Sequence, residues 1–92
     1  MCTYLAITTP VAASALRVDG SWLRVDTAVV AFDHPQDAPV EHALSVDLRV
    51  AGGDPTDHVT IELDAESARR LAETILAALE APEAAELIAF RQ

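Results

Sequence analysis

The chain has 92 residues and a mass of 9.8 kDa, the size of one domain with a single hydrophobic core. Its hydrophobic content of 51% excludes an intrinsically disordered chain, and its formal charge of −9 opposes binding to nucleic-acid phosphates. A domain this small buries only about 60–65% of the surface of its unfolded chain. We therefore expect a homo-oligomer, with a dimer favoured.

Targeting signals and cysteine content indicate the cellular compartment in which a protein works. No apolar stretch approaches the roughly 20 residues of a membrane-spanning helix, and the first residues lack the basic start and apolar run of a secretory signal. The single cysteine, Cys2, excludes a disulfide bond within the chain. We expect a cytoplasmic protein with no membrane and no nucleic-acid partner.

The first third of the chain predicts one strand and one hairpin. Residues 3–9 are rich in β-branched and aromatic types, and we expect this strand to end at Pro10. The Asp-Gly pair at 19–20 favours a tight turn that joins a strand at 15–18 to a strand at 22–25.

Three more strands are predicted between residues 27 and 63. Residues 27–33 are apolar at nearly every position, as in a strand covered on both faces. Residues 43–50 and 59–63 alternate apolar with polar types, and the Gly and Pro residues at 52–55 separate them. Consecutive strands with short connections indicate an antiparallel meander.

A long helix is predicted after the last strand. Asp64 is suited to cap its N-terminus, and Pro82 closes it after residues 65–81. Residues 83–92 form either a short second helix or a frayed tail. The apolar stripe of the long helix consists of Ala68, Leu71, Ala72, Ile75, Leu76 and Leu79.

These elements predict a single α+β domain over residues 1–92. We expect an antiparallel sheet of three to five strands with the long C-terminal helix packed on one face. Val29 and Ala31 then lie on the opposite face. Either a second subunit or the N-terminal hairpin covers them.

Two histidines stand at the ends of one predicted hairpin loop. His34 and His42 both follow the core-facing register of their strands, so their rings are expected to meet at one rim of the sheet. Such a pair can divide acid and base roles or bind a metal. The alternative is that each ring caps a strand end. His58 lies in a polar loop and is interpreted as structural or merely exposed.

Cys2 is the third candidate for chemistry. Removal of Met1 would leave an N-terminal cysteine whose amine can act as the base for its own thiol. A buried, inert cysteine beside Tyr4 is the alternative. We expect Cys2, His34 and His42 as catalytic residues, with Tyr4, Asp33 and Glu41 as binding residues.

Several short motifs are spread along residues 1–81: MCTY at 1–4, FDHP at 32–35, AP at 38–39, EH at 41–42, LSVD at 44–47, EL at 62–63 and ESAR at 66–69. Together they resemble a family of small actinobacterial proteins of unknown function. The resemblance implies that Cys2, His34 and His42 belong to one group. It implies no particular activity.

Three functions remain open from the sequence. The first is a small cofactor-independent enzyme that acts on a small organic substrate by cyclisation, isomerisation, dehydration or hydrolysis, with specialised metabolism as its setting. The second is a module that binds Zn²⁺ or another transition metal through Cys2, His34 and His42. The third is an interaction protein without chemistry.

Overall fold

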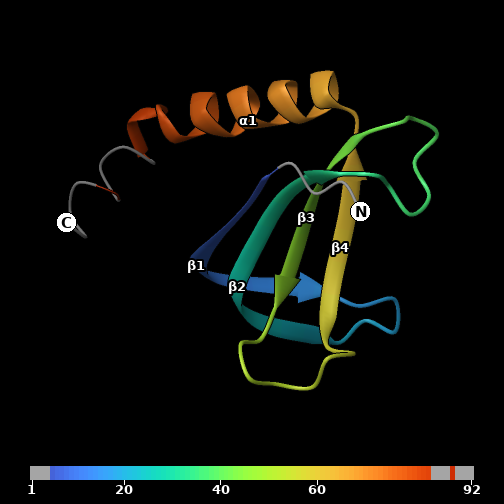
Figure 1. Cartoon of the computed structure of the whole chain (residues 1–92). Coiled ribbons are helices and arrows are strands. Elements are labelled where there is room, and N and C mark those ends of the chain that lie inside the picture. The colour runs from blue at the N-terminus through green and yellow to red at the C-terminus, as the bar shows by residue number, and fades with distance from the viewer. Residues whose placement is uncertain (1–4, 84–87, 89–92) are drawn as a thin grey trace.

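The structure, a computed structural model, describes residues 5–83 and residue 88. Four strands form one antiparallel sheet in the order β1-β2-β3-β4, and the helix α1 crosses one end of it (Figure 1). This confirms the predicted α+β class. The elements are β1 (Leu5–Leu16), β2 (Trp22–Asp33), β3 (Ala43–Arg49), β4 (His58–Leu63) and α1 (Ala65–Leu79).

The first two strands are longer than predicted. The expectation that Pro10 ends the first strand is wrong, because β1 continues through it to Leu16. Pro10 lies in an edge strand, where the pairing with β2 shifts register between Pro10 and Ala13. Edge strands and bulges tolerate proline because its missing N–H need not serve a ladder hydrogen bond. The segments predicted at 22–25 and 27–33 are likewise one strand, β2.

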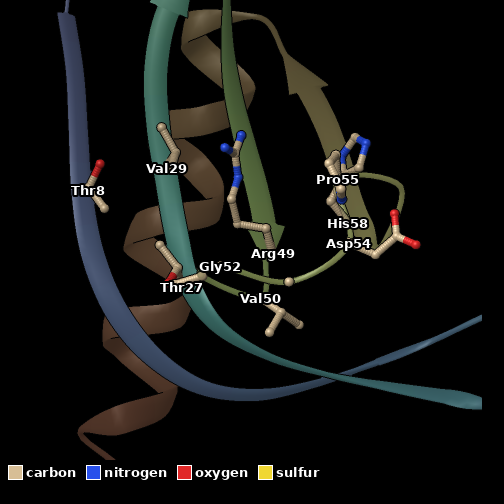
Figure 2. A pocket seen from close by; sticks show the side chains of 11 residues that line it. Thr8, Thr27, Val29, Arg49, Val50, Gly52, Asp54, Pro55 and His58 are labelled. Carbon is tan, nitrogen blue, oxygen red and sulfur yellow. The ribbon is translucent and has the colours of Figure 1, made fainter.

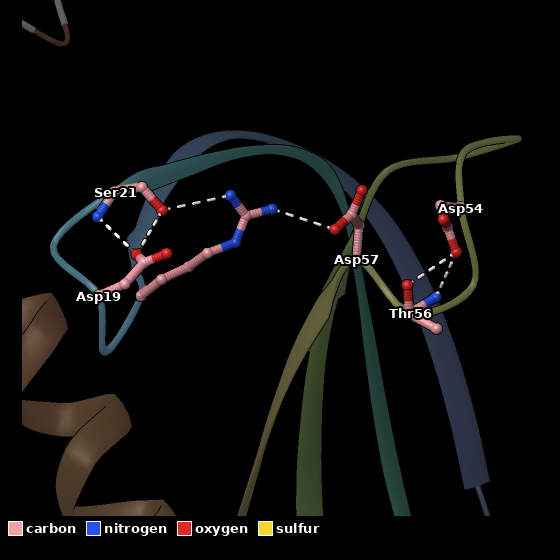
Figure 3. Close-up of polar contacts among 6 residues, drawn as sticks. Asp19, Ser21, Asp54, Thr56 and Asp57 are labelled. Atoms are coloured by element: carbon pink, nitrogen blue, oxygen red, sulfur yellow. Dashed lines mark hydrogen bonds and ion pairs between the residues drawn. The ribbon is translucent and has the colours of Figure 1, made fainter.

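The β1–β2 hairpin bends so that its far half crosses the lower ends of β3 and β4 (Figure 1). Its turn has Gly20 at a φ of 90° and Ser21 N–H donating to the Asp19 carboxylate at 2.8 Å. An ion pair of 3.0 Å joins Arg17 at this turn to Asp57 in the β3–β4 loop (Figure 3). The bend thus closes one end of the sheet.

Strand register divides the sheet into two chemically different faces. The helix face is apolar and carries Ala28, Val30, Phe32, Leu44, Val46, Leu48, Val59, Ile61 and Leu63. The open face is largely polar and carries Thr27, Val29, Ala31, Asp33, Ser45, Asp47, Arg49, His58, Thr60 and Glu62. Val29 and Ala31 therefore lie in a hollowed polar face, which the described part of the hairpin does not fold across.

The hydrophobic core of the described residues is small. Its buried apolar residues are Leu23 and Val25 in the bent part of β2, together with Ala28 and Ala43. No residue of α1 is buried. None of the described helices is long and apolar enough to cross a bilayer.

Helix α1 begins as predicted. The Asp64 carboxylate accepts a hydrogen bond of 2.7 Å from the Ser67 N–H, which satisfies one of the free amides of the first turn. We expect Asp64→Ala to lower the free energy of unfolding, and Asp64→Asn, which keeps the acceptor, to change it much less. Urea unfolding of the two variants measures the difference, and equal losses would contradict a capping role.

Candidate functional site on the open face

Three adjoining hollows lie on the open face, and His58 lines all of them. The hollow beside the β3–β4 loop has a volume of about 490 Å³ and is also lined by Val29 and Arg49 (Figure 2). The others, of about 790 and 360 Å³, extend toward the β2–β3 loop. Several hundred cubic ångströms is the size range of small-molecule sites.

Asp47 is the centre of the polar network in these hollows. Its side chain is buried, and its residue is only 8% exposed. Oδ1 accepts a hydrogen bond of 2.7 Å from the Thr60 hydroxyl and lies 2.9 Å from His58 Nδ1. Oδ2 accepts from Arg49 Nε at 2.6 Å and from a second nitrogen of the same guanidinium. Neighbouring strands β3 and β4 place these groups opposite one another.

The hydrogen bonds assign the tautomer of His58. An ionised carboxylate only accepts hydrogen bonds, so the Nδ1 atom beside Asp47 carries the hydrogen. The Nε2 atom of the neutral ring then holds a lone pair. Because 44% of the His58 side chain is exposed and the ring lines the hollows, a small molecule can approach it.

Asp47 stays ionised in this environment. Burial raises the pKa of its carboxyl group, but hydrogen bonds from Thr60, His58 and Arg49 and the positive charge of Arg49 outweigh burial. The net effect is a pKa below the ordinary value of 3.8. A negative charge therefore lies beside the His58 ring, with Oδ1 2.9 Å from Nδ1.

Arg49 brings hydrogen-bond donors to the same hollow. Its side chain is 50% exposed, and Asp47 is its hydrogen-bond acceptor within the part of the chain that the structure describes. A guanidinium has five N–H groups, so several remain for a ligand oxygen. Acid–base and oxygen-binding groups thus stand side by side.

Glu62 fastens the β2–β3 loop over this face. Its carboxylate accepts hydrogen bonds from the N–H groups of Gln36 at 2.5 Å, Asp37 at 2.9 Å and Ala38 at 3.1 Å. These hydrogen bonds, that of Gln36 first, lower the pKa of Glu62 below its ordinary value of 4.5. The carboxylate acts as a latch on the loop that separates His34 from His42.

The structure brings His34 and His42 together. Their rings stack with centroids 4.9 Å apart, and the His42 ring lies 6.0 Å from that of Phe32. His34 Nδ1 is 3.1 Å from the backbone carbonyl oxygen of Glu41. Their adjacency at the hairpin end is as predicted, but of the two only His34 lines a hollow on the open face.

The other predicted site residues contribute differently. The Asp33 carboxylate accepts from the backbone N–H of His34 at 2.7 Å. Cys2 and Tyr4 lie outside the described residues. Of the predicted group of Cys2, His34 and His42, the structure therefore describes the two histidines. Among the residues that are described, no three His, Cys, Asp or Glu side chains are placed to hold a metal ion.

His58 lies in a different part of the fold from the one predicted from the sequence. The interpretation of this residue as a loop histidine is corrected, since it begins β4 and is paired with Arg49. The available signal was polar alternation in two strands, with Asp47 and Arg49 in one and His58 and Thr60 in the other. Joining the two sets requires the strand register, which one sequence does not contain.

The comparison with known protein families confirms one part of the resemblance, membership of a family of unknown function. Residues 1–88 match DUF6295, a family of unknown function. The chain belongs to this family. No curated protein and no solved structure shows a significant match to it.

Proposed function

We propose that this DUF6295 protein is a small cofactor-independent enzyme that transfers a proton on a small organic substrate held in the open-face hollows. The observation that supports it is the 2.9 Å contact between His58 Nδ1 and the buried Asp47 carboxylate. A carboxylate in this position fixes the tautomer and orientation of a histidine base.

The proposed reaction follows from the three side chains. His58 Nε2 takes a proton from a carbon or oxygen of the substrate, and Asp47 stabilises the resulting imidazolium. Arg49 donates hydrogen bonds to the substrate oxygen on which negative charge develops. Return of the proton to another carbon gives isomerisation, and its transfer to a leaving hydroxyl group gives dehydration.

Site volume and protein charge narrow the substrate class. The hollow beside Arg49 and His58, of about 490 Å³, suits a compound of modest size. The formal charge of −9 repels multiply charged anions, so phosphorylated compounds are disfavoured. A carbonyl compound or a monocarboxylate with an acidic C–H bond fits both conditions.

Proton–deuterium exchange tests this function and requires no identified product. A panel of ketones, aldehydes and 2-oxo monocarboxylates is incubated with the protein in D₂O, and loss of C–H signals is followed by ¹H NMR. We expect His58→Gln to reduce the exchange rate about 100-fold or more, the usual contribution of a general base. Circular dichroism checks that the variant is folded.

His42→Gln is the matched control, because it removes an imidazole that does not line the three open-face hollows. It should leave the exchange rate within about twofold of the unmodified protein. Exchange no faster than in protein-free D₂O for every compound, or a loss caused by His42→Gln and not by His58→Gln, would argue against the proposed role of His58.

A further inference from the structure

Helix α1 leaves most of its apolar side uncovered. Leu71, Ile75, Leu76 and Leu79 fall on one side of the helix, and their exposed fractions range from 41% to 59%. A helix of a small domain normally buries such a stripe against its own core. Here the second half of α1 extends away from the upper ends of the strands (Figure 1), and its apolar residues Ile75, Leu76 and Leu79 are exposed.

The helix face of the sheet continues this exposed apolar area. Leu5 and Ile7 pair with Phe32 and Val30, so they lie on the helix face, and they are 53% and 52% exposed. Ile61 on β4 is 45% exposed. We call these residues and the four on α1 the apolar surface: Leu5, Ile7, Ile61, Leu71, Ile75, Leu76 and Leu79.

A hollow of about 530 Å³ lies between the helix and the sheet on this side. It is lined mainly by apolar side chains, Phe32 and Leu76 among them, with Arg69 and Glu73 also in its lining. The lining therefore offers apolar area together with one charge of each sign. A surface of this kind is complementary to itself under a twofold rotation, because each copy presents both charges.

The accessible surface area of the chain is larger than that of a compact monomer of the same mass. The accessible surface is 7116 Å², about 1,900 Å² more than the roughly 5,200 Å² typical of a compact monomer of this mass. The radius of gyration is 14.9 Å against about 12.3 Å for a compact chain of this length. A stable interface of standard size takes only about 800 Å² from each partner.

We infer that the apolar surface is the interface of a homodimer. Four small or medium apolar side chains make up the buried core of the described chain, so folding needs additional apolar burial. A second copy is present whenever the chain is made. Its apolar surface has the same area as that of the first copy and offers the opposite charge to Arg69 and to Glu73. The dimer therefore forms through the helix side, and the open face with His58 stays accessible.

A pair of leucine substitutions with equal exposure tests this interface. Leu76 lies in the apolar surface and is 59% exposed, whereas Leu16 lies near the turn of the β1–β2 hairpin and is 60% exposed. Light scattering after size exclusion should give the unmodified protein twice the mass of one chain. Leu76→Glu should raise the dimer dissociation constant about 100-fold or more, and Leu16→Glu should leave the dimer intact.

A second measurement covers the case in which Leu76→Glu weakens folding itself. The melting temperature of the unmodified protein should rise with protein concentration between about 1 and 100 μM, as mass action requires of a dimer that unfolds to monomers. Leu79→Glu, at the end of α1, should lower the dimer fraction as well. His58→Gln should not change the mass, which separates this inference from the proposed function.

Several outcomes would overturn the dimer. One is a single-chain mass for the unmodified protein at about 100 μM, even if an apolar compound then covers the apolar surface. Another is a melting temperature that does not depend on protein concentration. An equal loss of dimer in Leu76→Glu and Leu16→Glu would place the interface elsewhere.

Discussion

Asp47→Asn should lower the proton-exchange rate about 100-fold or more, because the amide loses the charge that stabilises the His58 imidazolium and can present its NH₂ group to Nδ1. It should also lower the free energy of unfolding by about 1 kcal/mol, since Arg49 loses its ionised partner and a partly buried hydrogen-bond network is broken. Exchange in D₂O measures the first effect and urea unfolding the second.

Asp54→Asn makes the same chemical change at the edge of the same hollow. Asp54 accepts hydrogen bonds from the backbone and hydroxyl of Thr56 in the exposed β3–β4 loop (Figure 3). Thr56 is not part of the Asp47 network, so the proton-exchange rate of Asp54→Asn should stay within about twofold of that of the unmodified protein. Equal loss of exchange in the two variants would mean that negative charge near the hollow, and not orientation of His58, matters.

Acidification should release the β2–β3 loop from Glu62. Hydrogen bonds from Gln36, Asp37 and Ala38 lower the pKa of this carboxyl group, so the latch adds stability above the ordinary value of 4.5. That stability is lost as the pH falls through the lower, folded-state pKa. In an NMR titration, the three amide protons should shift upfield together with a common midpoint below pH 4.5.

Glu62→Gln provides the control for this titration. The amide keeps an oxygen that accepts hydrogen bonds but has no charge to lose, so the shifts of these three amides should no longer depend on pH in that range. A common shift that persists in Glu62→Gln would assign the change to another carboxyl group. A common midpoint at or above pH 4.5 in the unmodified protein would contradict the latch.

Local chemistry explains why the helix and the last two strands were predictable. Polar and apolar residues alternate strictly in β3 and β4, and Asp64 caps α1 through residues next to it in the chain. Likewise, His34 and His42 flank one short loop, and any hairpin brings such positions together. Pro10 misled the prediction because its effect depends on whether its strand lies at an edge, which is a property of the sheet.

Strand periodicity, the helix cap and the adjacency of the loop histidines depend on near neighbours in the chain, so they can be predicted from the amino-acid order. The residues that share the open face cannot, because Asp47 and His58 meet through a register set by side-chain packing across strands. The exposure of the apolar stripe of α1 is likewise a property of the folded domain. Periodicity shows which side of a helix is apolar, whereas the bend and length of the sheet determine how much of that side it covers.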